Sequence, residues 1–123
     1  KEAIPLYRKV EGHEGEAVAF NNIGRIFLSR GDMEQARVNF ENAVRIVTEN
    51  GVVSIESLVC GNLGTLYDAT GEKRKAVTMF RRSVDAARQS GDKGAEAHGL
   101  NNLGKTQNDL GARTSAISFY EAA

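Results

Sequence analysis

Apolar residues recur along the chain with the spacing of a single helix face. Phe20, Ile23 and Phe27 lie three and four residues apart, which places their side chains on one side of an α-helix. A second apolar stripe begins after a short Gly-Asp break at Gly31, and the alternation continues along the chain. The pattern therefore predicts an all-α chain of about seven helices, at 1–11, 14–30, 33–50, 53–70, 73–90, 93–110 and 113–123.

Glycines mark the expected helix ends. The left-handed backbone position just beyond a helix favours glycine, and Gly31, Gly51 and Gly91 each follow an apolar stripe. Asp32 is expected to cap the helix that follows it, and Gly12 to separate the first two helices. Because the expected connections are only two or three residues long, neighbouring helices should be antiparallel.

The chain also repeats itself at an offset of 40 residues. Asn-Ile-Gly at 22–24 corresponds to Asn-Leu-Gly at 62–64 and again at 102–104. We expect a single array without an internal domain boundary. Its units are a partial copy at 1–12, then 13–51, 52–91 and a truncated unit at 92–123. Neither end shows the polar cap that usually closes a repeat array, so we expect a piece of a longer repeat protein.

These units resemble the tetratricopeptide repeat, whose small and large positions they reproduce in order. The first copy carries Ile23, Gly24, Phe27, Gly31, Ala36, Phe40 and Ala43; the second Leu63, Gly64, Tyr67, Gly71, Ala76, Phe80 and Ser83; the third Leu103, Gly104, Gly111, Ala116, Tyr120 and Ala123. The 40-residue unit with its Asn-Leu-Gly sequence is similar to Pins/LGN-type cell-polarity adaptors and to repeats of bacterial signalling proteins. The resemblance implies a right-handed α-solenoid of antiparallel helix pairs.

Three glycines fall in the middle of expected helices. A glycine there costs about 1 kcal/mol relative to alanine, so its recurrence in every full unit needs a physical reason. Close approach of the paired helix is the natural one. The glycines are Gly24, Gly64 and Gly104. Their expected small partners are Ala36, Ala76 and Ala116, and the aromatic residues expected to fill the gaps between units are Phe40, Phe80 and Tyr120.

Charge and composition narrow the function classes. The chain has 16 Lys plus Arg and 16 Asp plus Glu, so no basic surplus is present to hold a phosphate backbone, and we expect no nucleic-acid partner. The single cysteine fits a reducing compartment, so we expect a cytoplasmic protein. No apolar run is long enough for membrane insertion.

The sequence offers no arrangement typical of catalysis or metal binding. His13 and His98 lie far apart in the expected stack, and neither has ligand partners at metal-binding spacing. Cys60 occupies a position that is apolar in the other units, which favours a core role. We therefore expect a protein that is not an enzyme and needs no cofactor.

The resemblance implies that the first helix of each pair lines a concave groove. The recurring Asn22, Asn62 and Asn102 are its sharpest feature, because a side-chain amide can both donate to and accept from a peptide backbone. The alternative is that these residues bridge neighbouring helices. The predicted peptide-binding residues are Asn21, Asn22, Arg25, Asn62, Thr65, Asp68, His98, Asn101, Asn102, Lys105, Asn108 and Asp109.

We expect the partner to be a protein, bound through an extended or helical peptide segment of mixed charge. The chain would then act as an adaptor or scaffold. Two alternatives remain open at this point. One is a self-assembling structural scaffold, and the other is a peptide-sensing regulatory domain of a larger signalling protein.

Overall fold

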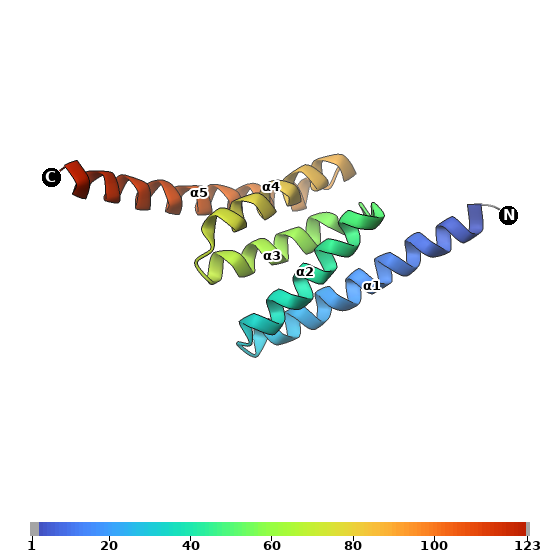
Figure 1. Ribbon diagram of the computed structural model, residues 1–123. Coiled ribbons are helices and arrows are strands. Elements are labelled where there is room, and N and C mark those ends of the chain that lie inside the picture. The colour runs from blue at the N-terminus through green and yellow to red at the C-terminus, as the bar shows by residue number, and fades with distance from the viewer. Residues whose placement is uncertain (1–2, 123) are drawn as a thin grey trace.

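The computed structural model describes the backbone of residues 3–122 and the side chains of residues 12–111, and the described chain is entirely helical (Figure 1). The all-α prediction is therefore confirmed over this range. The helices are α1 (Ala3–Ser29), α2 (Met33–Asn50), α3 (Glu56–Ala69), α4 (Lys73–Ser90) and α5 (Lys93–Ala122).

The turns between these helices follow the predicted chemistry. Each contains a glycine with a positive φ, a backbone conformation that side-chain-bearing residues rarely adopt. Asp32 caps α2 by accepting a hydrogen bond of 3.1 Å from the backbone N–H of Gln35. The positive-φ glycines are Gly31, Gly51, Gly71 and Gly91.

Five helices are present in the described residues where the sequence predicted about seven. The backbone stays helical through Gly12 and Gly111, so His13 lies inside α1 instead of in a loop. A mid-helix glycine costs only about 1 kcal/mol, whereas starting a new helix requires a costly first turn.

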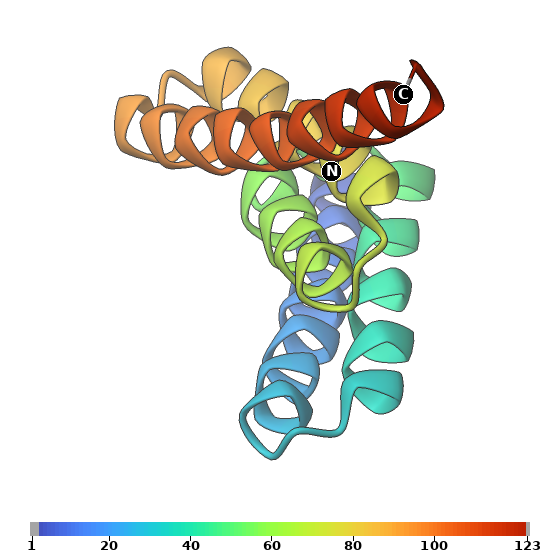
Figure 2. The same cartoon turned by 90° about the vertical axis from the view of Figure 1, so that its left-hand side faces the viewer.

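Neighbouring helices form antiparallel pairs around a continuous core. In Figure 1, α1 runs beside α2 and α3 beside α4, while α1 begins and α5 ends on opposite sides of the molecule. Figure 2 shows that the helix direction turns from the α1–α2 pair to α5. The largest fully buried apolar side chains are Phe40, Phe80, Leu66, Val47, Val52 and Val59.

Two mid-helix glycines allow a close approach, as predicted, but the group they accommodate is an aromatic ring. A Cβ added at Gly24 would lie 2.7 Å from Phe40 Cδ1, and one added at Gly64 would lie 2.7 Å from Phe80 Cε1. The expected partners Ala36 and Ala76 are buried, but their atoms are not the nearest ones.

The third glycine of the series differs from the other two. A Cβ added at Gly104 meets no described atom within 4 Å, because α5 continues past Gly111 instead of folding back. Ala116 and Tyr120, the residues expected to pack there, lie outside the residues whose side chains are described.

Candidate functional site

The predicted site residues divide by exposure into three groups. Asn21 is buried, with only 1% of its surface accessible. Asn62, Asp68, Asn102 and Asp109 are half-buried. The exposed members are Asn22, Arg25, Thr65, His98, Asn101, Lys105 and Asn108.

One of the three recurring asparagines bridges two helices. The Asn62 side-chain amide nitrogen donates a hydrogen bond of 2.8 Å to the Asn21 amide oxygen, which joins α3 to α1. Asn21 is therefore an internal structural residue, and the bridging alternative holds for this pair. The side chains of Asn22 and Asn102 make no hydrogen bond with any residue in the described range 12–111.

The two predicted acidic residues are held by one lysine. Lys73 Nζ lies 2.7 Å from an Asp68 carboxylate oxygen and 3.5 Å from one of Asp109, so it links α3, α4 and α5. The buried Thr106 hydroxyl donates to Asp68 at 3.3 Å. The hydrogen bond to Asp68 raises the pKa of Lys73 above its ordinary value. These carboxylates are thus compensated internally, whereas Arg25 and Lys105 have no acidic partner within residues 12–111.

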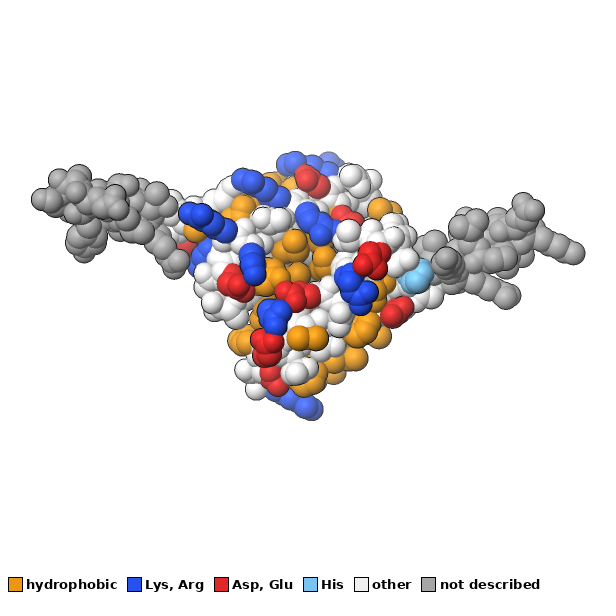
Figure 3. Space-filling view, in the orientation of Figure 1, with side chains coloured by type: hydrophobic (Ala, Val, Ile, Leu, Met, Phe, Trp, Pro, Cys, Tyr) orange, Lys and Arg blue, Asp and Glu red, His pale blue; other side chains and the backbone are white. Residues whose placement is uncertain are grey.

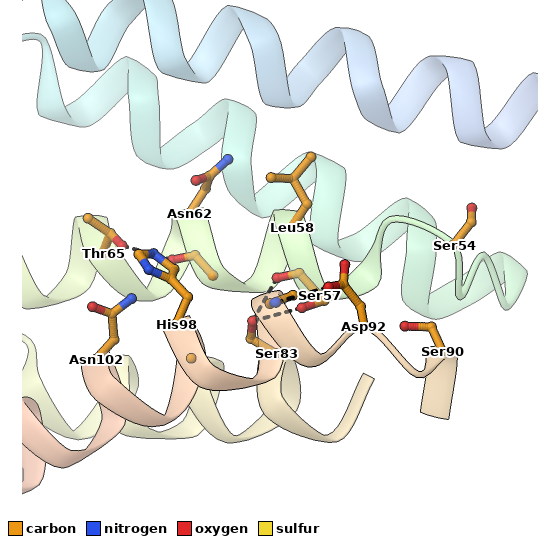
Figure 4. A pocket seen from close by; sticks show the side chains of 13 residues that line it. Ser54, Ser57, Leu58, Asn62, Thr65, Ser83, Ser90, Asp92, His98 and Asn102 are labelled. Atoms are coloured by element: carbon orange, nitrogen blue, oxygen red, sulfur yellow. Dashed lines mark hydrogen bonds between the residues drawn. The ribbon is translucent and has the colours of Figure 1, made fainter. Parts of the chain in front are cut away.

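A cavity of about 260 Å³, here called the α3–α5 cavity, lies between those two helices (Figure 4). Four of the predicted residues meet there: Asn62 and Thr65 from α3 are across from His98 and Asn102 from α5. The other lining residues are Ser54, Ser57, Leu58, Gly61, Ser83, Ser90, Asp92, Ala95 and Gly99.

A second, more open hollow of about 370 Å³ lies along α1 and brings Asn22 together with Arg25. Ile26 and Ser29 complete its lining. Asn101, Lys105 and Asn108 line neither hollow, although all three side chains are exposed.

Several lining residues of the α3–α5 cavity were missed by the sequence analysis. The Ser83 hydroxyl donates to the Ser57 carbonyl oxygen at 2.7 Å and lies 3.2 Å from the Ser57 hydroxyl oxygen. Asp92 caps α5 by accepting from the Ala95 N–H at 3.0 Å. The sequence contained a signal for these polar residues, because the residues 40 positions earlier, Ala17, Ala43 and Val52, are all apolar.

Two further titratable side chains have structural roles. Cys60 is fully buried, which confirms its predicted core position, and burial raises the pKa of its thiol to about 11. The Tyr67 hydroxyl donates to a Glu41 carboxylate oxygen at 2.6 Å, and burial together with this bond raises the pKa of Tyr67. Neither residue lines the α3–α5 cavity.

The described residues contain no cluster of His, Cys, Asp and Glu that could hold a metal ion. Within the same part of the chain, no helix has both the length and the apolar character needed to cross a membrane. The features that the helices do assemble are the α3–α5 cavity and the open hollow along α1.

Comparison with known proteins identifies the repeat. Residues 17–46, from the second half of α1 and most of α2, match the tetratricopeptide repeat, and so do residues 59–94, which cover most of α3, all of α4 and the first turn of α5. The two matches together cover more than half of the 123 residues. No individual curated protein matches the chain. Repeats of this kind are protein–protein interaction modules. The helix pairs, their small and aromatic packing positions and these two matches show that the chain belongs to the tetratricopeptide repeat family.

Proposed function

We propose that the chain binds an extended or helical peptide segment of a partner protein along α1, α3 and α5. The observation that carries the proposal is a set of exposed or half-exposed polar side chains without partners among residues 12–111. A partner can bind such groups without breaking hydrogen bonds inside the protein. We call the surface that they form, together with Thr65, the groove: Asn22, Arg25, Thr65, His98, Asn102 and Lys105.

The charges of the groove suggest the chemistry of the bound segment. Arg25 and Lys105 are free to pair with a ligand, while Lys73 already compensates Asp68 and Asp109. On the face seen in Figure 3, by contrast, positive and negative side chains are interspersed. We therefore infer that the bound segment carries acidic side chains opposite Arg25 and Lys105, because complementary charges accelerate and orient association.

The same proposal includes the handedness of the superhelix, the role of the chain and its cellular location. The helix pairs wind as one continuous array into a right-handed superhelix, and the first helices line its concave side. The chain acts as an adaptor or scaffold in the cytoplasm. These statements are supported by the 40-residue unit, which resembles Pins/LGN-type adaptors, and by the single cysteine.

Reversing the two free charges is expected to weaken peptide binding at least tenfold. Peptides would first be selected from a random displayed library against the wild-type protein, and their dissociation constants measured by fluorescence anisotropy. The Arg25→Glu/Lys105→Glu variant should lose affinity because it presents two carboxylates to an acidic ligand. Arg45→Glu/Arg81→Glu is the matched control, since both of its arginines are exposed on α2 and α4. Equal affinity of both variants, or failure to select any peptide, would contradict the proposal.

Self-association is the second candidate function, and one observation favours it. Ile23 and Ile26 on α1 are 41% and 51% exposed. The residues one unit later, Leu63 and Leu66, are 3% and 1% exposed because the neighbouring unit covers them. A second copy of the chain stacked on α1 would cover the two isoleucines in the same way.

Sedimentation velocity over a wide concentration range tests this second candidate. The mass of the wild type should rise above the monomer value of 13.3 kDa, and Ile23→Ser/Ile26→Ser should restore the monomer. Val53→Ser is the control, since this exposed valine lies in the loop before α3. A wild type that remains monomeric at every concentration would rule the candidate out.

A further inference from the structure

The contact between α3 and α5 is built from smaller or more polar residues than the equivalent contact between α1 and α3. Five positions around the first contact are buried, and each has an equivalent 40 residues later. The buried set is Ala17, Asn21, Ala43, Val52 and Val59, and the equivalent set is Ser57, Gly61, Ser83, Asp92 and Gly99. The second set is smaller or more polar at every position, and all five of its residues line the α3–α5 cavity, although Val84 Cγ2 packs against Gly99.

One missing group can be identified from this comparison. At the first contact, the Asn21 carboxamide occupies the site, and its oxygen accepts the 2.8 Å hydrogen bond from Asn62. One unit later, Asn102 stands where Asn62 stood, but Gly61 replaces Asn21. The Asn102 amide lines the cavity without a partner among residues 12–111. The second contact thus retains the donor and lacks the carboxamide that accepts from it.

We propose that the α3–α5 cavity binds a carboxamide group, carried by an Asn or Gln side chain of the partner peptide. This inference rests on the proposed function and specifies one side chain of the bound segment. The Asn102 amide N–H donates to the ligand oxygen, as Asn62 donates to Asn21. The Ser83 hydroxyl oxygen lines the same cavity, would lie 3.3 Å from a Cβ at Gly61, and can accept from the ligand NH₂ group.

The charge of the lining favours a neutral group over an ion. The cavity contains the Asp92 carboxylate and no Lys or Arg side chain, which disfavours a ligand carboxylate or phosphate. Asp92 is exposed and lies ten residues before Asn102, at the start of α5, so it does not attract a cation to the part of the cavity beside Asn102. A carboxamide supplies both a donor and an acceptor at no cost of burying a charge.

Capped single amino acids can test the inference without knowledge of the partner. The probes are N-acetyl methylamides of glutamine, asparagine, glutamate and alanine, titrated into the ¹⁵N-labelled protein and followed by NMR. The Gln or Asn probe should shift the amide signals of Gly61, Gly99 and Asn102, with at least tenfold tighter binding than the Glu and Ala probes. Free acetamide should shift the same signals more weakly. Equal shifts from all four probes would overturn the proposal. Tighter binding of acetamide would contradict the part of the proposal that assigns the carboxamide to a peptide side chain.

Filling the cavity provides the matched variant. Gly61→Asn/Ser83→Ala introduces two of the five residues of the first contact, and the alanine makes room because a Cβ at Gly61 would lie 3.3 Å from the Ser83 hydroxyl oxygen. This variant should lose the Gln and Asn response at least tenfold. Asn102→Ala should do the same without adding bulk. Asn42→Ala, on α2, is the control, since Asn42 does not line the cavity and its side chain accepts a hydrogen bond of 3.3 Å from Arg45. Unchanged binding in both cavity variants would overturn the proposal.

The outcomes also separate this inference from the proposed function. Library-selected peptides that depend on Arg25 and Lys105 but bind the filled variant normally would refute the carboxamide site alone. If no selected peptide depends on Arg25 and Lys105, the groove proposal fails. A specific response to the Gln or Asn probe would then still establish the cavity as a carboxamide site.

Discussion

Replacing Gly64 with leucine is expected to destabilise the protein by about 2–3 kcal/mol, the upper part of the usual range for overpacking a core. A Cβ at Gly64 would lie only 2.7 Å from Phe80 Cε1, so the added side chain must displace a buried ring. The same replacement at Gly104 meets no described atom within 4 Å. There it should leave stability unchanged or raise it by up to about 1 kcal/mol, since leucine favours a helix more than glycine does.

Thermal unfolding followed by circular dichroism measures the difference directly. Gly64→Leu should lower Tm by roughly 10 °C, and Gly104→Leu should not lower it. The two glycines occupy equivalent positions 40 residues apart, so helix propensity is matched between them. A similar fall in both variants would show that the Phe80 ring is not the cause.

Replacing Phe80 with alanine is expected to cost about 3–5 kcal/mol, the range for removing a buried aromatic side chain. Phe80 is 2% exposed, and its ring fills the space left by Gly64. Because leucine at position 64 would occupy part of the vacated space, Gly64→Leu/Phe80→Ala should be more stable than the sum of the two single losses predicts.

Urea unfolding of the two single variants and the double variant measures this coupling. Phe20→Ala is the control within the same fold, since Phe20 on α1 is only partly buried and should cost less. Strict additivity of the Gly64 and Phe80 changes would mean that the ring and the glycine do not share one space.

The helix ends that could be predicted are those decided by local chemistry. Gly31, Gly51 and Gly91 adopt positive φ values, and glycine meets that requirement whatever surrounds it. Gly12 and Gly111 were wrongly expected to end helices. Whether a glycine interrupts a helix also depends on how the next segment packs, and this information is not present in a local pattern.

The candidate site could be predicted in part for the same reason. The exposure of Asn22 and Arg25 follows from their places on an amphipathic helix. The burial of Asn21 and the capture of two carboxylates by Lys73 depend on distances between units, which a repeat pattern alone does not fix. The α3–α5 cavity could have been predicted from the sequence, because the residues that surround it differ in size from their equivalents in the preceding unit.

The filled and empty contacts also bear on how such a chain can change over generations. In a stack, each unit touches only its neighbours, so a substitution such as Asn to Gly at one joint leaves the other joints intact. This molecule contains Asn21 on α1 at the first contact and Gly61 at the equivalent position of α3 at the second. Replacing large residues by small ones at one contact between units can therefore create a new binding cavity, while the other contacts maintain the stability of the protein.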